Sequence, residues 1–534
     1  MNQAEVRRRQ IQLCSLCLGL LTIRIIGNRI GDLGVTYLVA AMEAFALLWT
    51  LVGRPVPDTL GKMLRVRVAK GQYKNADKMR RSLIGFQAIM GVLCAICLVA
   101  LAGVVSEKVY ELPYTKFLIM MLAPVIVIRV INEVLLGIFQ GDGSELPSAV
   151  SSLLRQVLIL LFGILFAKML SGYGEKVSKL LGQETFVAMY GCVGVMIAML
   201  IAEGIVLLFL LVVYRSASKN RKKKDVEGMR STDSVVGQVY ALYSAMGIPI
   251  LIGLLELLPL WIGFLYYRKI TAEVAGAIEI YGIYIGKYMV ICGIAFALLA
   301  ALILPVAAKC AIMVRKDEQR YAKNVFMSGI KSIVVFALFF SVYIFVMAGQ
   351  FAGAISSVNP ELLTRMLECG SWLVFFGVLS YYGLHLMRMI GKKYLIIGCL
   401  AIADIVYVVS ISLFLKNTNS GGMALVYAGV LGVGVLAVVS CGFMFQYLHG
   451  GIDFLRVFII PGLSICVSGL VGLLLGKALT PHLGNVVTLV VVLVLAMVVH
   501  LALVVFLRTF REQETEVVPL GRILRAIGQM LGVF

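Results

Sequence analysis

Charged side chains inside apolar segments are the groups that could do chemistry in this chain of 534 residues. Arg24, Arg54 and Lys287 each lie in, or at the end of, a long apolar stretch. A charge in hydrocarbon is costly and usually faces a polar cavity or a partner. A guanidinium binds an oxyanion through two parallel hydrogen bonds, and an ammonium attracts it as a point charge. The three cations therefore predict a binding site for an anion such as a phosphate group.

Four further charged residues are candidates, and two of them have an alternative role. Arg29 is a second cation of the first apolar segment, and it can instead extend to the membrane surface. Arg129 is a candidate cavity cation, but it lies four residues before Glu133, so the two can simply pair along one helix face. Glu43 and Glu256 are candidate cavity acids, which could couple transport to Na⁺ or H⁺.

Catalytic and metal-binding motifs are not evident. Two CxxC pairs, at 14–17 and 94–97, lie in apolar stretches without His or acidic neighbours, so we interpret them as packing residues. Residues 471–478 fail the phosphate-loop pattern at both ends, and the four His residues are scattered. We expect no catalytic residue, no metal and no cofactor, and hence a protein that is not an enzyme.

Membrane-spanning helices are the elements that must position these charges. The chain is 61% hydrophobic and 14% charged, with a mean hydropathy of +0.98, whereas soluble domains are about 45–50% apolar and about 25% charged. Apolar runs of about 20 residues, long enough to span a bilayer, recur throughout. We predict an all-α polytopic membrane protein with fourteen transmembrane helices, at 11–27, 36–57, 83–104, 117–138, 149–168, 186–213, 237–264, 276–303, 329–352, 366–387, 394–414, 422–445, 456–476 and 485–507.

Lysine and arginine determine the expected orientation. With the N-terminus in the cytoplasm, most of these residues fall in cytoplasmic segments, and the bias stays in phase with fourteen spans. Both termini are therefore expected in the cytoplasm. The net charge of +20 follows from this topology, and the basic run 221–224 is expected to face anionic membrane lipids rather than nucleic acid.

A weak internal repeat suggests two pseudo-symmetric halves. An offset of 248 residues aligns Pro57 with Pro305 and Tyr73 with Tyr321, in both cases around a basic segment that follows a span. We expect two six-helix lobes, 1–215 and 236–415, joined by a basic linker, 216–235. Two C-terminal helices within 422–507 and a tail, 508–534, follow. Apolar residues on one face of the tail predict an amphipathic helix at the membrane interface.

Two proline- and glycine-containing segments are candidate hinges or gates. Gly137, Gln140, Gly141 and Pro147 lie around a short acidic turn between the fourth and fifth spans. Gly permits close approach of two helices, and Pro begins the next helix. We expect Asp142 and Glu145 of this turn to face basic segments of the opposite lobe. Pro249 and Pro259 flank Glu256 in the seventh span, where a kink suits a helix that bends.

The same residues carry a resemblance to a known family. Gly137-Ile138-Phe139-Gln140-Gly141 followed by Pro147 resembles the MOP superfamily of exporters, and so do Gly53-Arg54-Pro55 and the segment 69–76, AKGQYKNA. The resemblance is strongest to the polysaccharide-exporter branch, which includes O-antigen flippases, stage V sporulation protein B and lipid II flippases. It implies two six-helix bundles, alternating access and a cationic central cavity for the diphosphate of an undecaprenyl-linked sugar.

The resemblance also implies particular site residues. Arg24 and Arg54 match functional arginines of lipid II flippases in the first two spans, whereas Lys287 stands where those proteins have Arg and Glu43 where they have Asp. We therefore expect a flippase for a lipid-linked anionic glycan, monomeric, in the bacterial plasma membrane, with its lipid tail in a groove beside the last two spans. A MATE-type multidrug or cation antiporter is the alternative, and a membrane-bound glycan polymerase or transferase is a more distant one.

Overall fold

The computed structural model describes residues 3–112, 114–183, 185–222, 234–270, 276–356, 359–417, 421–449 and 454–530. These residues form helices and short connections, without strands. Twelve of the helical segments are long and apolar enough to cross a membrane. Many exposed side chains on these helices are large and hydrophobic, as expected for contact with lipid; Leu161 and Leu474 are examples. The chain is a multi-pass membrane protein.

Two of these twelve segments are hairpins rather than single helices. α1 (Gln3–Val52) is interrupted at Gly31, with φ 72° and ψ 172°, and α17 (Ile460–Phe506) at Gly484, with φ 72° and ψ 167°. Only glycine adopts this backbone conformation readily. A Cβ on Gly27 would lie 3.1 Å from the Val35 side chain, so the chain folds back at the first break. Each hairpin crosses twice, which is consistent with the fourteen predicted spans.

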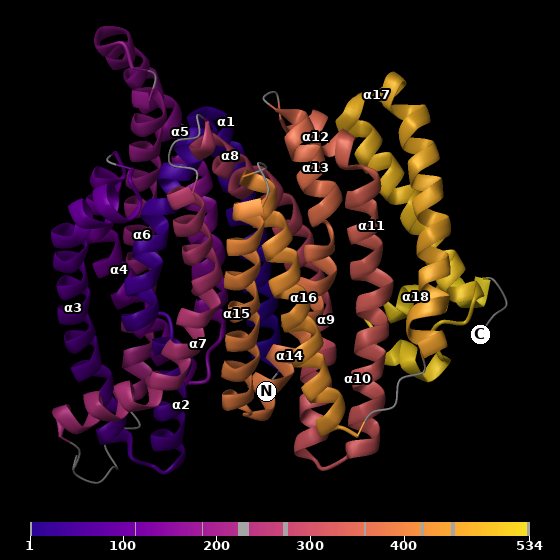
Figure 1. Ribbon diagram of the computed structural model, residues 1–534. Helices are drawn as coiled ribbons and strands as arrows, with labels where there is room; N and C mark the ends of the chain where they lie inside the picture. Colours follow the sequence, from indigo (N-terminus) through magenta and orange to yellow (C-terminus); the bar gives the residue numbers. More distant parts are fainter. Residues whose placement is uncertain are drawn as a thin grey trace. The chain divides into compact units, whose positions relative to one another are not determined.

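The chain divides into two compact units (Figure 1). The N-unit, Arg7–Gly282, contains most of α1, then α2 (Val56–Ala69), α3 (Tyr73–Gly103) with a π-helical end at Val104–Val109, α4 (Thr115–Gly141), α5 (Leu146–Leu181), α6 (Thr185–Lys222), α7 (Val235–Ile270) and the first residues of α8 (Ala277–Ile283). α5 packs along α6, and α4 packs on α2, α3 and α6. A core of buried Val, Leu, Ile, Ala and Met side chains joins α2, α3, α4 and α7.

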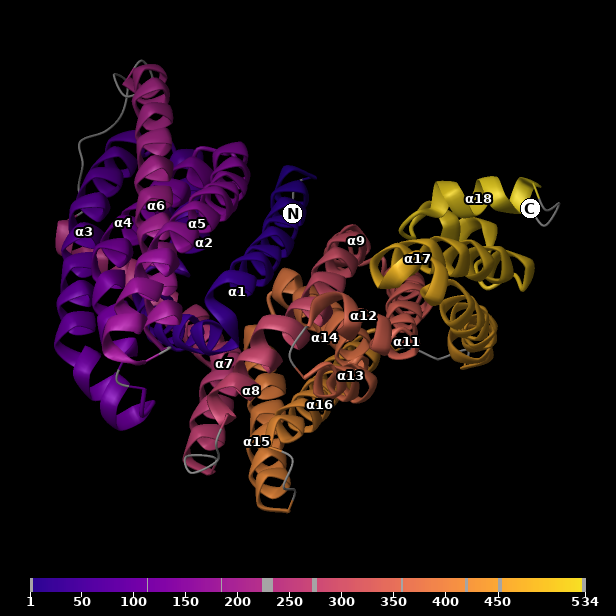
Figure 2. The same ribbon diagram turned by 90° about the horizontal axis from the view of Figure 1, so that it is seen from above.

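The C-unit is Ile283–Phe534 together with Met1–Val6. Its elements are a π-helical turn Tyr284–Tyr288, α9 (Met289–Arg315), α10 (Gln319–Ile333) continued by the π-helical turn Val334–Leu338 and α11 (Phe339–Val346), α12 (Ala348–Ile355), α13 (Pro360–Gly370), α14 (Trp372–Ile390), α15 (Lys393–Asn417), α16 (Gly421–Tyr447), the π-helical turn Leu455–Ile459, α17, a 3₁₀ turn Glu512–Glu516 and α18 (Gly521–Met530). α14 packs on α9 and α16, and α17 packs on α11 and α12 (Figure 2).

The tail of the C-unit is tied to its transmembrane helices. Lys331 of α10 donates to both carboxylate oxygens of Glu514, at 2.8 and 3.0 Å. In α18, Leu524 is buried while Ile523 and Met530 are exposed, so this short helix presents apolar side chains outward. The predicted amphipathic stripe continues to Phe534, and its last residues, 531–534, lie outside the described part.

The two units divide at Gly282, within the eighth predicted span. The expected lobes, 1–215 and 236–415, are joined by the basic linker, and this division stays a prediction. Most of that linker, residues 223–233, lies outside the described residues. The repeat that suggested the two lobes stays a prediction.

Candidate functional site

Arg54 lies at a break in the second transmembrane crossing and pairs with an acid of α7. The amide N–H groups of Gly53 and Arg54 both donate to the Trp49 carbonyl, which closes the end of α1, and Pro55 begins α2. Arg54 Nη2 lies 2.5 Å from Glu256 Oε2. The two side chains keep 36% and 27% of their surface exposed, so the pair borders an open region.

A close approach between helices brings this pair together. A Cβ on Gly253 would lie 2.7 Å from Thr50 Cγ2, so α7 passes against α1 with almost no gap. Arg54 Nη1 lies 3.5 Å from the Gly253 carbonyl oxygen, at the limit of a hydrogen bond. Pro249 and Pro259 lie inside α7 on either side of this contact, as the sequence places them.

Arg24 lies nearer than Arg54 to the hairpin break at Gly31. Arg24 donates to Asn28 Oδ1, one turn later in the same helix. With a rise of about 1.5 Å per residue, Arg24 is about 10 Å before the break and Thr50 about 28 Å after it. Because Arg54 contacts α7 at the level of Thr50, the two guanidinium groups differ in depth by about 18 Å. The structure therefore separates two cations that the sequence grouped in one site.

Arg29 and Arg129 have different surroundings from these two. Arg29 is exposed next to the Gly31 break. Arg129 is largely buried: its Nε lies 2.9 Å from Glu133 Oε1, as the four-residue spacing indicates, and its Nη1 lies 2.6 Å from Glu203 Oε1. Its guanidinium also lies over the Trp49 ring, 4.9 Å from the centroid. Arg129 thus has both a structural pairing on its own helix and a second acidic partner on α6.

Glu203 is the centre of a buried ionic network. Arg155 Nε of α5 lies 2.6 Å from Glu203 Oε1, and Asn132 Nδ2 of α4 donates to Glu203 Oε2 at 2.8 Å. Glu203 and Arg155 expose only 4% and 8% of their side chains. Two arginines, Arg129 and Arg155, balance the charges of two glutamates, so the network joins α4, α5 and α6 without a net charge.

Glu43 occupies an aromatic pocket of the N-unit. The Tyr281 hydroxyl lies 3.5 Å from Glu43 Oε1, and the buried Oε2 has no hydrogen-bond partner among the described residues. The Phe264 ring lies 4.7 Å from that of Tyr281 and 5.2 Å from that of Tyr110, centroid to centroid. Trp261 Nε1 donates to the Tyr110 hydroxyl at 3.0 Å. An acid with a spare oxygen in such a pocket can hold a proton or a cation.

The turn between α4 and α5 packs tightly against α2. Gly137, Gln140, Gly141 and Pro147 are all buried. A Cβ on Gly141 would lie 2.6 Å from Leu64 Cβ, which explains the absence of a side chain there. This packing shows why the turn has its composition, and the proposed hinge or gate role of these four residues stays a prediction.

The two acids of this turn have partners within their own unit, which corrects the expectation that they face the opposite lobe. Asp142 lies 2.7 Å from Arg80 of α3. Glu145 lies 3.2 Å from Arg8 of α1 and 2.5 Å from Arg65 of α2. The local reason is that α1, α2 and α3 all begin or end beside this turn and bring their arginines to it. The acids thus join α1, α2 and α3 to the turn between α4 and α5.

Lys287 belongs to the C-unit and lies in the π-helical turn Tyr284–Tyr288. Its side chain is buried, and Nζ donates to Ser356 Oγ at 3.2 Å. Two tyrosines of the same turn stack: the rings of Tyr284 and Tyr288 lie 5.5 Å apart, and the Tyr288 hydroxyl donates to the Gly370 carbonyl at 3.0 Å. π-helical turns occur frequently at functional sites.

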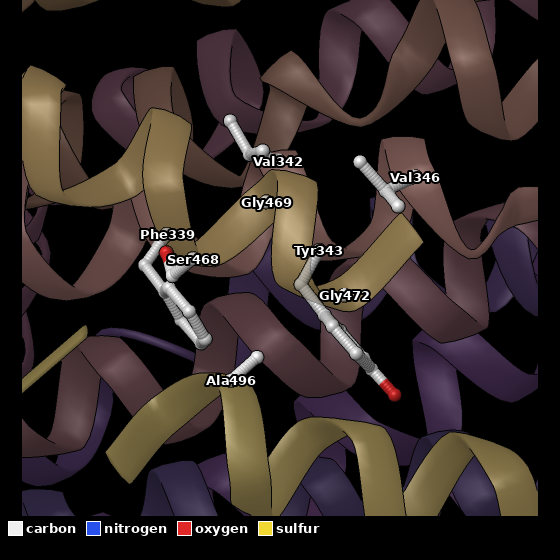
Figure 3. Close-up of a pocket in the computed structure, with 8 residues that line it drawn as sticks. All are labelled: Phe339, Val342, Tyr343, Val346, Ser468, Gly469, Gly472 and Ala496. Atoms are coloured by element: carbon white, nitrogen blue, oxygen red, sulfur yellow. The ribbon is translucent and has the colours of Figure 1, made fainter. Parts of the chain in front are cut away.

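A narrow hollow with room for about one water molecule lies between α11 and the two arms of α17 (Figure 3). Its walls are almost entirely apolar, and the α17 side is made of small residues. The lining residues are Phe339, Val342, Tyr343, Val346, Ser468, Gly469, Gly472 and Ala496. Small residues opposite aromatic rings leave a narrow apolar slot between these helices.

Hydrogen bonds of two side chains, His500 and Tyr343, hold the second arm of α17 beside this slot. His500 is fully buried; its Nε2 lies 3.0 Å from the Val335 carbonyl oxygen, its Nδ1 lies 3.2 Å from Ser464 Oγ, and its ring stacks on Phe339 at 4.8 Å. The Tyr343 hydroxyl donates to the Leu489 carbonyl at 2.5 Å. Val335 lies in a π-helical turn, where the altered backbone pairing lets a carbonyl accept a side-chain donor.

Metal ligands do not gather in the structure. No group of three or more His, Cys, Asp or Glu side chains that could hold a metal ion occurs among the described residues.

Known proteins share this architecture. No protein-family model matches the chain. Over 210 residues it is 27% identical to stage V sporulation protein B of Bacillus subtilis (strain 168), a match that spans 38% of this chain and 38% of that protein. Its structure resembles an inward-facing multidrug resistance MATE family transporter of the MOP superfamily, with a TM-score of 0.61 and 14% identity over 84% of this chain and 98% of the other. The chain has the MOP superfamily fold.

Two further structures with the MOP fold resemble the chain. The Vibrio cholerae MATE transporter VcmN in its bent form has a TM-score of 0.56 at 14% identity, covering 83% of this chain and 97% of that one. A MOP superfamily transporter of Pyrococcus furiosus, described as having a binding pocket of reverse polarity, has a TM-score of 0.57 at 15% identity, covering 83% and 94%. These two proteins are described as transporters.

Within the MOP fold, sequence reasoning found the ionisable residues of the spans but not all of their partners. It singled out Arg129 and missed the role of Arg155, because the two lie on different helices. It also missed His500, since a lone histidine in an apolar span is more often a packed core residue than a functional one. The only available signal was its place in the last span, facing Ser464 across the hairpin.

Proposed function

We propose that the chain is a flippase that moves a lipid-linked anionic glycan, of the undecaprenyl-diphosphate type, across a bacterial plasma membrane by alternating access. The observation that supports this most directly is Arg54, a partly exposed guanidinium at a helix break in the membrane that already holds one oxyanion, the carboxylate of Glu256. Phosphate oxygens bind arginine through the same charge-assisted geometry.

The headgroup diphosphate would contact the cations in turn. Arg54 and Arg24 differ in depth by about 18 Å along the N-unit, which is too far for one diphosphate to bridge. We therefore propose that Arg54 and Arg24 are successive stations for the headgroup. Lys287 is a third proposed cation, contributed by the C-unit, and Arg29 a fourth, beside the Gly31 break.

The lipid tail would occupy the slot between α11 and α17. Its walls are apolar, and the exposed surfaces of α17 are rich in Val and Leu, as a lipid-facing groove requires. This agrees in place with the groove expected beside the last two spans. The similarity to a sporulation protein of Bacillus subtilis supports the bacterial plasma membrane as the location.

A leaflet-translocation assay in proteoliposomes tests the proposal. The cargo is a fluorescent undecaprenyl-diphosphate sugar, and the variants are Arg24→Ala, Arg54→Ala and the double variant. Arg81→Ala is the matched control, because Arg81 is an exposed arginine of the N-unit that pairs only locally with Asp77. We expect lipid movement in the wild type and in the control, and its loss in the double variant. Undiminished lipid movement in the double variant would refute the proposal that Arg54 and Arg24 bind the headgroup in turn.

A MATE-type cation antiporter is the second candidate, favoured by Glu43. Its buried Oε2 without a hydrogen-bond partner among the described residues, and the aromatic rings around it, suit a proton or a cationic drug. The same proteoliposomes loaded with a cationic dye test it. Dye movement driven by a Na⁺ or H⁺ gradient, absent in Glu43→Gln and accompanied by no lipid movement, would replace the flippase. A glycan polymerase or transferase finds no supporting catalytic group among the described residues.

Partners other than the cargo are also proposals. We propose that anionic lipids bind the basic linker and the outward face of α18, where Ile523 and Met530 are exposed next to Arg522. A monomer is proposed as the working unit, and Na⁺ or H⁺ as the coupling ion.

A further inference from the structure

The Arg54–Glu256 pair resembles an occupied anion site. We propose that the Glu256 carboxylate takes the position on Arg54 that a phosphate oxygen of the cargo takes, so that the cargo binds by displacing Glu256 and leaves when Glu256 returns. This inference rests on the proposed flippase function and deepens it, because it names the group that releases the headgroup.

The chemistry of the two ligands is interchangeable at this guanidinium. Arg54 Nη2 donates to Glu256 Oε2 in a charge-assisted hydrogen bond. Carboxylate and phosphate both offer acceptor oxygens to the same face of a planar guanidinium. A diphosphate brings more negative charge than a carboxylate, so it can compete for the same donors.

Exposure distinguishes this pair from the buried pairs of the N-unit. Arg54 and Glu256 keep 36% and 27% of their side-chain surface exposed, whereas Arg155 and Glu203 keep 8% and 4%. A buried pair cannot exchange partners without leaving an uncompensated charge. A partly exposed pair is weak, and solvent can reach both groups when they separate. Arg54 can therefore change its partner, and Arg155 cannot.

The backbone around Glu256 gives it room to move. Pro249 and Pro259 flank it within α7, and each lacks the N–H that an uninterrupted helix would use. Gly253 lies between them at the closest approach to Thr50, so α7 is held at this point and weakened on both sides. Gly253 and Glu256 lie on the same stretch between the two prolines, so the carboxylate leaves Arg54 by rotation of its own side chain while the contact at Gly253 stays in place.

The proposal predicts opposite effects on binding and release when Glu256 loses its charge. Glu256→Gln removes the competing anion but keeps the size of the side chain. Inorganic pyrophosphate should then bind more tightly, by about two- to fivefold, the range expected for losing one exposed ionic competitor. In transport, the lower KM should come with a lower kcat, because the group that expels the headgroup is missing. A purely structural role for Glu256 would weaken binding instead.

Isothermal titration of pyrophosphate into the purified full-length protein in nanodiscs tests this. Asp77→Asn is the matched control, because Asp77 also pairs with an arginine at 2.7 Å but on the exposed surface of α3. We expect tighter binding in Glu256→Gln, no change in Asp77→Asn, and no gain when Glu256→Gln is combined with Arg54→Gln. Equal or weaker binding in Glu256→Gln, or a gain that persists without Arg54, would overturn the proposal.

The outcome is separable from that of the flippase proposal. If the gain in pyrophosphate affinity depends on Arg54 but the wild type moves no lipid, the anion site stands and the flippase fails. If lipid moves and depends on Arg54, yet Glu256→Gln leaves affinity and kcat unchanged, the flippase stands and the exchange by Glu256 fails. Thermal unfolding of each variant in the same nanodiscs identifies any variant that is misfolded, and Glu256→Asp then provides the second comparison.

Discussion

At the scale of single residues, burial separates the charges of the N-unit into two kinds. Arg129, Arg155 and Glu203 lie in a closed network with 17%, 8% and 4% of their side chains exposed, and their charges are matched there. Arg54 and Glu256 are paired at a similar distance but remain accessible. A buried charge must keep its partner, so we assign the buried network a role in stabilising the fold. We assign the accessible pair a role in exchanging one partner for a ligand.

The closed network predicts a large loss of stability when its centre is neutralised. Glu203→Leu would leave Arg129 and Arg155 sharing only Glu133, and removing one partner of a buried pair typically costs about 3–5 kcal/mol. We expect a clear fall in the thermal unfolding temperature of the detergent-solubilised protein. Asp77→Leu removes an acid from an exposed pair and should change it little. Equal unfolding temperatures for Glu203→Leu and the wild type would contradict this assignment.

At the scale of elements, breaks within helices place the functional groups. The Gly53–Pro55 break directs Arg54 toward α7, and the π-helical turn 284–288 contains Lys287. The π-helical turn 334–338 provides the Val335 carbonyl that accepts from His500. In an uninterrupted helix, a carbonyl such as that of Val335 would accept a hydrogen bond from its own helix. The breaks therefore allow one helix to contact another through polar groups.

His500 should therefore control the slot between α11 and α17. His500→Met removes the donor to Val335 but keeps apolar volume, whereas His500→Gln retains an amide donor at nearly the same reach. We expect His500→Met to raise the KM for a long-chain lipid cargo severalfold with a smaller change in kcat, and His500→Gln to recover most of the loss. The measurement is lipid translocation at a series of cargo concentrations. Failure of Gln to perform better than Met would show that the hydrogen bond has no part in forming the slot.

At the scale of the whole molecule, the two hairpin breaks determine the number of crossings. With Gly31 and Gly484 each reversing the chain, an even number of crossings places both termini on one side of the membrane. Reporter proteins fused to either end, one active only in the cytoplasm and one only outside it, test this. We expect both ends to report the cytoplasm, as the lysine and arginine distribution indicates. Opposite locations for the two ends would exclude fourteen crossings.

Composition, hydropathy and charge were enough to determine the all-helical membrane architecture, because a bilayer accepts only helices or closed barrels and each span needs a long apolar run. The same information identified Arg24, Arg54, Glu43, Glu256 and Lys287, since an ionisable residue in a span stands out against its neighbours. It also gave the pairing of Arg129 with Glu133, which depends only on helical spacing.

Only the tertiary structure decided which charge meets which. Arg54 and Glu256 are 202 residues apart in the chain, and nothing local links them. Glu145 was expected to face the other lobe, but its partners come from α1 and α2 because α1 begins and α2 ends beside its turn. Arg24 and Arg54 look equivalent in sequence, yet the hairpin at Gly31 places them at different depths. Pairing and depth depend on how helices pack, and a hydropathy pattern, which reports each span separately, contains no record of that packing.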